Sequence, residues 1–275
     1  MGPNGSGKTT LSSIIASVRK QTSGEVRVFG KVPDKSKDLM GYIPQDNFSD
    51  PHLTGRENLR YFARMRGYTN KETEAMVEDL IERVDLLEDT DKRVSKYSGG
   101  MKKKLELATI LYPGIKVLIL DEPTTGLYPL ARRKFFGLID EIKDKTTTIL
   151  LITHLGSYAE LATRVGLINN GMLIADGSPG ELKNNNKFKS IINIVTSINN
   201  DKVKNILDSF NQGDELLETE EGYKLYSDES SEVIPKIVRT IEKKGYKVIQ
   251  IGSTEPSLED VFFKLTGKQF REVKQ

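Results

Sequence analysis

Apolar and polar residues follow two periods along this chain, and these periods predict alternating strands and helices. The runs 117–120 and 149–152 are apolar at every position, which is typical of buried strands. Residues 25–30 alternate between apolar and polar, which predicts a half-buried strand, and 39–45 is expected to be a short strand that runs into a loop. The segments between these strands carry the helical period.

Three helices are expected in the first 90 residues of the chain. The first follows residue 7, carries apolar positions at helical spacing as far as Val18, and ends in a turn at 21–24. The second opens with the capping box of Thr54 and Glu57, and the third covers about 71–87. We interpret the second and third helices as a helical insertion.

Composition narrows the class of protein. The chain has 275 residues, of which 37% are hydrophobic, enough for one good core and a smaller second one. Its 41 basic and 39 acidic residues give a net charge of +2, which leaves no electrostatic footprint for nucleic acid. The basic runs 102–104 and 132–134 are expected to be solvated helix faces, and the lack of cysteine excludes disulfides and thiolate metal sites. No apolar run approaches the ~20 residues that span a bilayer, so we expect a soluble, cytoplasmic protein.

Residues 2–9 fit the phosphate-binding pattern G-x-x-x-x-G-K-[ST]. Glycines allow the backbone to curl so that successive N–H groups face one centre, and the positive end of the following helix adds to the field. In such a cradle the Lys8 ammonium reaches the β- and γ-phosphates and the Thr9 hydroxyl ligates Mg²⁺. A plainer interpretation is a glycine-rich turn before an ordinary helix. The expected nucleotide-binding residues of the loop are Asn4, Gly5, Ser6, Gly7, Lys8, Thr9 and Thr10.

A phosphate loop is normally the exit of a buried strand, and only Met1 precedes this one. The chain is therefore expected to lack its usual N-terminal strands, as a fragment or through a late start, unless another segment supports the loop. We expect the upstream DNA to encode, in frame, a short β-rich segment with an aromatic residue.

Two further motifs carry charge chemistry. Ser98 is an N-cap before Gly99 and Gly100, whose free N–H groups could hold a second anion, although alone the motif is only a helix cap. Asp121 and Glu122 end a fully apolar strand, at the edge where α/β sheets bind ligands. Adjacent carboxylates are costly without a cation, and Mg²⁺ would supply one. Asp121 would then hold the hydration shell of the ion, and Glu122 would face the attacking water.

Together these motifs resemble the ATP-binding cassette of ABC transporters. The phosphate loop, Gln45, the Ser-Gly-Gly at 98–100, the carboxylate pair and His154 follow one another in the order of that family. Tyr97 and the tail at 256–267 are similar to the branch of ATPases for drug resistance and lipid export.

The resemblance implies an α/β fold, a P-loop NTPase cassette at 1–185 with a helical subdomain at about 46–112. Beyond a hairpin at 166–177, the polar run 183–187 is expected to be a linker. Residues 186–275 follow the order βαββαβ, which predicts a small ferredoxin-like α+β accessory domain. Its strands are expected at 188–196, around 215–217, around 223–225 and at 246–251, and its helices at 202–210 and 233–243.

The family implies roles for individual residues. ATP would lie between two head-to-tail cassettes, bound by Lys8 of one subunit and by Ser98 of the other. Gln45 would contact Mg²⁺ and water and also face the membrane partner, and His154 would sense the γ-phosphate. The implied catalytic residues are Glu122, His154 and Gln45, the implied metal ligands are Thr9, Gln45 and Asp121, and Ser98, Gly99 and Gly100 complete the nucleotide site.

One departure concerns Tyr128, which stands where the family usually has an acidic residue, and His52 is expected to be a plain loop residue. We expect an ATPase subunit of an exporter, peripheral on the cytoplasmic face of the cell membrane. Its partners would be a second copy, as a homodimer, and a separate integral membrane permease, which selects the substrate, with no nucleic acid. A non-transport ABC ATPase and a non-catalytic fragment are the rival interpretations.

Overall fold

The computed structural model describes residues 1–142, 147–184, 190–211, 216–219 and 221–266. Contacts divide the chain into two units, the first made of Met1–Ser6 with Leu155–Gln275 and the second of Gly7–His154.

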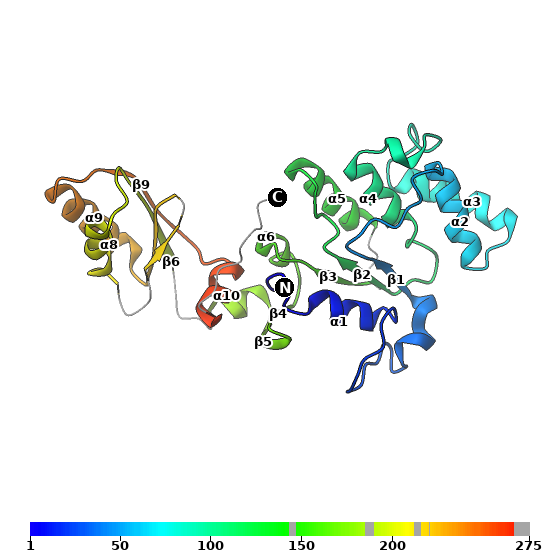
Figure 1. Ribbon diagram of the computed structural model, residues 1–275, viewed down its shortest axis with the longest axis horizontal. Coiled ribbons are helices and arrows are strands. Elements are labelled where there is room, and N and C mark those ends of the chain that lie inside the picture. The colour runs from blue at the N-terminus through cyan, green and yellow to red at the C-terminus, as the bar shows by residue number, and fades with distance from the viewer. Residues whose placement is uncertain (143–146, 185–189, 212–215, 220, 267–275) are drawn as a thin grey trace. The chain divides into compact units, whose positions relative to one another are not determined.

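A parallel sheet forms the centre of the second unit. Its strands are β1 (Met40–Ile43), β2 (Val117–Asp121) and β3 (Thr148–Ile152), in that order across the sheet (Figure 1). Helix α1 (Lys8–Ile15) packs against β2 and β3. The three strands confirm the apolar pattern of the sequence. Because they are parallel, their carboxyl ends lie at one edge of the sheet, where ligands bind in open α/β folds.

The prediction of a strand at 25–30 is wrong. In this segment, Val28 forms only an isolated bridge with Lys31, around a turn in which Phe29 and Gly30 have φ of 50° and 75°. A short 3₁₀ helix, Pro33–Leu39, leads on to β1. Alternation of side chains predicts a half-buried surface, but a strand also needs a neighbour to receive its hydrogen bonds.

Helix α1 is shorter than expected. It ends at Ile15, Ser17 has a φ of 60°, and Val18 is 68% exposed instead of continuing an apolar face. The buried side chains of α1 are Lys8, Ser12 and Ser13. The buried residues of α1 are therefore polar, while the partly buried Ile15 packs against the cluster that contains Ile119 and Ile152.

A helical part of the second unit consists of α2 (Gly55–Met65), α3 (Asn70–Arg83) and α4 (Gly99–Ala108), with a short 3₁₀ helix, Val94–Lys96, before α4. The predicted capping box of Thr54 and Glu57 is confirmed, and a second one joins Thr69 and Glu72 at α3. The apolar core here includes Ile43, Leu59, Val77, Leu80, Ile81, Leu105 and Leu107.

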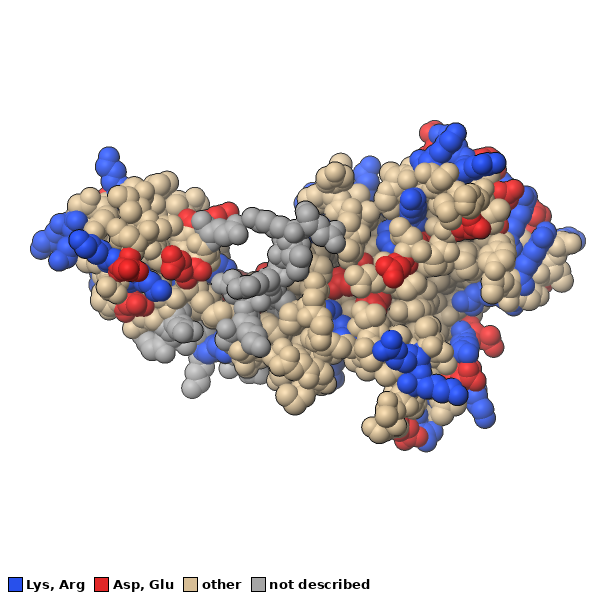
Figure 2. Space-filling model, in the orientation of Figure 1, with Lys and Arg blue, Asp and Glu red and all other residues tan. Residues whose placement is uncertain are grey.

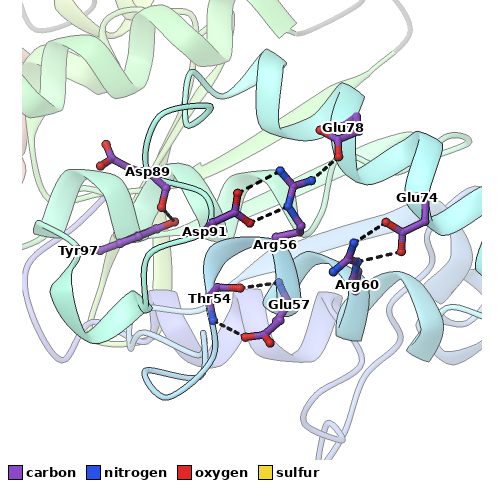
Figure 3. Close-up of polar contacts among 9 residues, drawn as sticks. All are labelled: Thr54, Arg56, Glu57, Arg60, Glu74, Glu78, Asp89, Asp91 and Tyr97. Carbon is purple, nitrogen blue, oxygen red and sulfur yellow. Dashed lines mark hydrogen bonds and ion pairs between the residues drawn. The ribbon is translucent and has the colours of Figure 1, made fainter.

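Ion pairs join these helices at the surface. Arg56 of α2 pairs with Glu78 of α3 and with Asp91 of the following loop, and Arg60 pairs with Glu74 (Figure 3). Solvent screens such pairs at the surface, so the core beneath them supplies most of the stability. Figure 2 shows Lys and Arg interspersed with Asp and Glu over this region, instead of one continuous basic surface.

The basic run 102–104 contains one exception to its expected solvation. Lys103 is only 4% exposed. Lys104, by contrast, is partly exposed, and its ammonium pairs with the exposed carboxylate of Asp85. Successive helical residues point about 100° apart, so three consecutive lysines cannot all lie on one solvated face. The expectation is therefore wrong for Lys103.

Helix α5 (Pro129–Ile142) follows β2 and packs against α4. In the first unit, α6 (Gly156–Ala159) precedes a hairpin of β4 (Val165–Asn169) and β5 (Met172–Gly177), which confirms the expected pair. Helix α7 (Pro179–Asn184) comes next, so the linker expected at 183–187 begins as helix, and its remainder lies outside the described residues.

Met1 lies beside β4 in the first unit. Its ammonium group donates to Gly166 O at 2.7 Å, and Ile168 N donates to Met1 O at 2.8 Å. A C-terminal helix, α10 (Leu258–Thr266), packs against α6 and α7. The backbone that enters the phosphate loop is thus hydrogen-bonded to a strand of the first unit.

In the described residues between 190 and 254, the first unit forms four strands and two helices. They are β6 (Ser190–Thr196), α8 (Asp201–Asp208), β7 (Leu217–Glu218), β8 (Tyr223–Ser227), α9 (Ser230–Lys243) and β9 (Val248–Thr254). The strands form an antiparallel sheet in the order β7-β8-β6-β9, and both helices pack on Ile192, Ile194 and Leu225 (Figure 1). This is the βαββαβ order of elements. The domain boundary at 185/186 falls outside the described residues and stays a prediction.

None of the helices in the described ranges combines the length and the apolar character that crossing a membrane requires.

Candidate functional site

The phosphate-loop motif passes from the first unit into the second between Ser6 and Gly7. Ser6 N donates to Pro3 O at 3.2 Å, and Gly5 and Gly7 have φ of 79° and 97°. Only glycine adopts this left-handed backbone without strain, which explains two of the glycines in the motif. Gly7 then caps α1, so Lys8 and Thr9 begin the helix.

Gly2 and Lys8 illustrate how closely the loop is packed. A Cβ on Gly2 would lie 2.2 Å from Ile168 O, so no other residue fits there. Lys8 is only 7% exposed, and burial lowers the pKa of its ammonium although Glu122 and Asp121 oppose this effect. Lys8 is thus a desolvated cation that faces two carboxylates. Of the other loop residues, Asn4, Gly5, Thr9 and Thr10 are exposed and Ser6 is buried.

Asp121, at the carboxyl end of β2, is fully buried and bonded to α1. Thr9 Oγ1 donates to Oδ1 at 3.2 Å and Ser12 Oγ donates to Oδ2 at 2.7 Å. Burial raises the pKa of Asp121, and the hydroxyl donors and Lys8 oppose the rise. The structure therefore brings together Lys8, Thr9 and Asp121, as expected from the sequence.

Ser12 was not expected in the site. The apolar residues around Ser12 predict an apolar face of the helix, and this pattern assigns no contact to the Ser12 hydroxyl. The signal that could have identified it is its spacing, since Ser12 lies one helical turn after Lys8 on the same face. Burial raises the pKa of the Tyr42 hydroxyl and Asp121 adds to the rise, while a hydrogen bond with Ser12 opposes it, so Tyr42 is a second residue beside Asp121 that the sequence pattern does not indicate.

Glu122 has a φ of 47°, an uncommon conformation for a residue other than glycine. Its backbone N–H donates to Ile152 O at 2.9 Å, which extends the pairing of β2 with β3. Oε2 lies 2.9 Å from Nδ1 of His154, just after β3, while Oε1 is buried and has no hydrogen-bond partner among the described residues. Strained backbone of this kind is frequent at functional sites.

Gln45 follows β1 and has an exposed side chain. The backbone carbonyl oxygen of Gln45 accepts a hydrogen bond from Lys103 Nζ at 3.5 Å. In the described residues, no hydrogen bond joins its side chain to Thr9 or Asp121. The structure thus places Gln45 beside the end of β2 without bringing its amide to the other expected metal ligands.

Ser98 is the N-cap of α4, as expected. Its hydroxyl accepts a hydrogen bond from Met101 N at 3.2 Å, and a Cβ on Gly99 would lie 3.2 Å from Leu127. Ser98 and Gly99 are exposed, and Gly100 is partly exposed. In this chain the hydroxyl of Ser98 caps its own helix and does not reach Asp121. The free N–H groups at the start of α4 are accessible to an anion from outside.

Tyr128 is 84% exposed at the start of α5. The turn before it is fixed by Gly126, with a φ of 77°, by the buried Leu127, and by Arg132, whose Nε donates to Leu127 O at 2.7 Å. The loop therefore keeps its shape while the Tyr128 ring points into solvent. His52 lies in an exposed turn, as expected for a plain loop residue.

The oxygen atoms of Thr9 and Asp121 are suitable ligands for Mg²⁺ in a nucleotide complex. Mg²⁺ prefers oxygen ligands and usually takes one or two from protein, with phosphates and water filling the rest. Thr9 Oγ1 and Asp121 Oδ1, 3.2 Å apart, are such a pair, and a cation would offset the burial of the carboxylate. No cluster of three or more His, Cys, Asp or Glu side chains suited to a metal occurs in the part of the chain that the structure describes.

Comparisons with known proteins show which family this chain resembles. The family model described as "ABC transporter" matches residues 1–125. The chain is 33% identical to "Daunorubicin resistance ATP-binding protein DrrA2" of Streptomyces coeruleorubidus, over 97% of this chain and 85% of that protein. It is also 33% identical to "Nod factor export ATP-binding protein I" of Burkholderia thailandensis, over 99% of this chain and 88% of that protein.

Larger relatives match over part of their length. "ABC transporter A family member 3" of Arabidopsis thaliana is 33% identical, and the chain spans 30% of it. Among solved structures, "Structure of ATP binding subunit of ABC transporter" is similar with a TM-score of 0.59 and 27% identity, over 67% of this chain and 79% of that one. A dimeric post-hydrolysis ATP-binding cassette bound to ADP and Pi shares the fold, with a TM-score of 0.59 at 22% identity.

Proposed function

Because this chain belongs to the ABC transporter family, as an ATP-hydrolysing subunit of the export type, we propose that two copies close head to tail on ATP and drive a separate membrane permease. Relatives of nearly the same length are named for daunorubicin resistance and for Nod factor export. We propose that the permease selects the exported compound. The chain would work at the cytoplasmic face of the membrane.

ATP binding is assigned to the loop and the end of β2. Lys8 would neutralise the β- and γ-phosphates, and the residues 4–10 would surround them. Thr9 and Asp121 would hold Mg²⁺, which supplies charge neutralisation for the phosphates when bound. Two observations support this assignment: the burial of Lys8 beside both carboxylates, and the 3.2 Å contact of Thr9 with Asp121.

Hydrolysis is assigned to Glu122, and its contact with His154 is the observation that carries the proposal. One carboxylate oxygen is held by His154 at 2.9 Å, and the other is buried without a partner in the described residues. A carboxylate held in this way can accept a proton from a water molecule in line with the γ-phosphate. His154 would keep Glu122 in position and sense the phosphate, and Gln45 would reach the water and Mg²⁺ on ATP binding.

The dimer supplies the part of the site that one chain leaves open. Ser98, Gly99 and Gly100 expose the start of α4, which could bind the γ-phosphate held by a second copy. The same-fold cassette solved as a dimer supports this arrangement.

Contact with the permease is assigned to a hollow beside Gln45. This hollow has a volume of about 480 Å³ and its lining includes Pro44, Phe48, Phe62 and Met65. Met65 is 68% exposed, so apolar surface is available to a partner. A permease segment bound here would lie against the residues that follow Gln45. It would therefore move when ATP binding displaces these residues.

The test compares ATP turnover of the full chain alone and together with a co-expressed membrane permease, in lipid vesicles. We expect turnover that depends on Glu122 and rises severalfold with the permease. Substituting Met65→Glu should remove the stimulation and leave basal turnover unchanged. Turnover that no membrane partner stimulates would support the non-transport ATPase, and its complete absence would support the non-catalytic fragment.

A further inference from the structure

Two buried charged residues near the site, Lys103 and Glu106, are not among the residues assigned to ATP binding or hydrolysis. Lys103 and Glu106 lie one turn apart on α4, with side chains 5% and 0% exposed and Nζ 2.9 Å from Oε2. Desolvating two charges is costly, and a well-packed apolar pair is often as stable. Leu105 and Leu107, on the same helix, are fully buried, so apolar side chains suit this core. Packing alone therefore does not explain the ion pair.

Both charges also bind the backbone that follows β1. Lys103 Nζ donates to Gln45 O at 3.5 Å, and Phe48 N donates to Glu106 Oε1 at 3.1 Å. Hydrogen bonds to charged groups are roughly twice as strong as neutral ones. Burial raises the pKa of Glu106, and the contacts with Lys103 and with the N–H groups of Phe48 and Ser49 oppose the rise. The ion pair thus fastens residues 45–48 to α4.

Helix α4 begins at the other candidate phosphate contact. Ser98 caps the helix five residues before Lys103, and continuous helical hydrogen bonds connect the two. A displacement of residues 45–48 is therefore transmitted to Ser98–Gly100 through a rigid element. In the proposed dimer, Gln45 belongs to the ATP site of its own subunit and Ser98 to that of the partner.

We propose that Lys103 and Glu106 are positioning residues, which hold the segment of Gln45 and the start of α4 as one body and thereby couple the two ATP sites of the dimer. The inference rests on the proposed function, because it needs Gln45 and Ser98 to face different nucleotides. Lys103 and Glu106 touch neither nucleotide. They act by making ATP bound at one site favour the closed geometry at the other.

The test replaces both charges together, because a single substitution would leave an unpaired buried charge. In Lys103→Met/Glu106→Leu, apolar groups of similar size fill the space and all three links are lost. We expect the Hill coefficient of ATP hydrolysis, which lies between one and two when two sites are coupled, to fall to one, and kcat to fall with it. ATP affinity in the presence of EDTA should stay within about twofold of wild type, because the uncoupled site is otherwise intact.

Two matched variants complete the design. Lys103→Arg/Glu106→Asp keeps both charges and should restore cooperativity. Lys102→Met removes one charge from the same helix at a partly exposed position and should behave as wild type. A Hill coefficient and kcat that do not change in the Met/Leu variant overturn the inference, as does a wild-type Hill coefficient of one.

Hydrogen exchange gives a second readout if the Met/Leu variant does not fold. In Glu122→Gln with Mg-ATP, residues 46–48 and 99–103 should gain protection together, over the same range of ATP concentration. Protection at clearly different concentrations overturns the inference. An inactive wild type that still binds ATP overturns the assignment of hydrolysis, and the exchange experiment then tests the inference alone.

Discussion

Nδ1 of His154 lies 2.9 Å from Oε2 of Glu122, across the paired ends of β3 and β2. The two residues are 32 positions apart in the sequence, and the parallel register places them at one edge of the sheet. One oxygen of the Glu122 carboxylate is thereby fixed, while Oε1 has no hydrogen-bond partner in the described residues.

The first prediction follows from this contact. Glu122→Gln should leave ATP binding intact and reduce turnover by ~10²–10⁴-fold, because an amide does not accept the proton of water. Single-turnover hydrolysis with radiolabelled ATP measures the rate, and gel filtration should show an accumulated ATP-bound dimer. Glu141→Gln, at an exposed position of α5, is the control. A near wild-type single-turnover rate would contradict the role of Glu122.

The second prediction concerns Ser12, whose hydroxyl donates to Asp121 at 2.7 Å. Ser12→Ala should lower kcat/KM for Mg-ATP by about tenfold or more, since a hydrogen bond to a charged group contributes about 1.5–3 kcal/mol. Ser13→Ala is a matched control, because the Ser13 hydroxyl donates only to a backbone carbonyl of the same helix, that of Thr10, at 2.9 Å. Steady-state kinetics at several Mg²⁺ concentrations will compare the two. Equal losses in both variants would mean that Ser12 only supports the helix.

The third prediction tests the shared site. Ser98→Arg should block hydrolysis while ATP still binds the monomer, because a bulky cation would fill the anion pocket that faces the partner. Mixing this variant with Lys8→Ala should restore one intact composite site in the heterodimer, measured as recovered turnover. Normal turnover by the Ser98→Arg homodimer would show that the sandwich does not apply to this protein.

The fourth prediction concerns Tyr128, which is 84% exposed on a loop of fixed shape. Tyr128→Asp should raise the Hill coefficient of hydrolysis with little change in nucleotide affinity, because the substitution leaves Gly126 and Leu127 in place. Hydrolysis as a function of ATP concentration will decide. If rate and Hill coefficient both stay at wild-type values, tyrosine is an accepted substitute at this position.

The fifth prediction is a pH dependence of stability. Tyr97 donates to Asp89 O at 2.8 Å beside α2, and burial raises the pKa of its hydroxyl to about 12 (Figure 3). Above pH ~10 the unfolded chain loses this proton while the folded chain keeps it, so stability falls as pH rises toward the folded value. The fall attributable to Tyr97 is up to about 1.4 kcal/mol per pH unit.

Denaturant unfolding of the wild type and of Tyr97→Phe from pH 8 to 12 will measure this effect. Tyr97→Phe should lose less stability across the alkaline range, although it begins less stable because one hydrogen bond is missing. Tyr61→Phe, at a position 53% exposed, is the control. Parallel stability curves for wild type and Tyr97→Phe would contradict the prediction.

Sequence was sufficient for several features that depend on neighbours along the chain. The capping box of Thr54 and Glu57 and the cap at Ser98 were predicted because their hydrogen bonds span three residues. The apolar runs 117–120 and 149–152 were predicted as strands because complete burial leaves no polar position. The order of the motifs led to the family, which the comparisons then showed.

Sequence was misleading where a partner distant in the chain decides the outcome. Among the described residues no strand lies beside the alternating segment 25–30, and it ends in a turn at Phe29 and Gly30. The middle lysine of 102–104 is buried because Glu106 and the carbonyl of Gln45 compensate its charge. The spacing of apolar and polar residues along the chain does not reveal either of these distant partners.

By itself, then, the sequence determined the residue types of the site, the elements that carry them and the family. Only the tertiary structure decided which groups meet: Ser12 with Asp121, His154 with Glu122, and Lys103 and Glu106 with the backbone after β1. The physical reason is that burial and hydrogen bonding between distant segments depend on the register of the sheet and the rotation of each helix. Both are set by the packing of the whole unit.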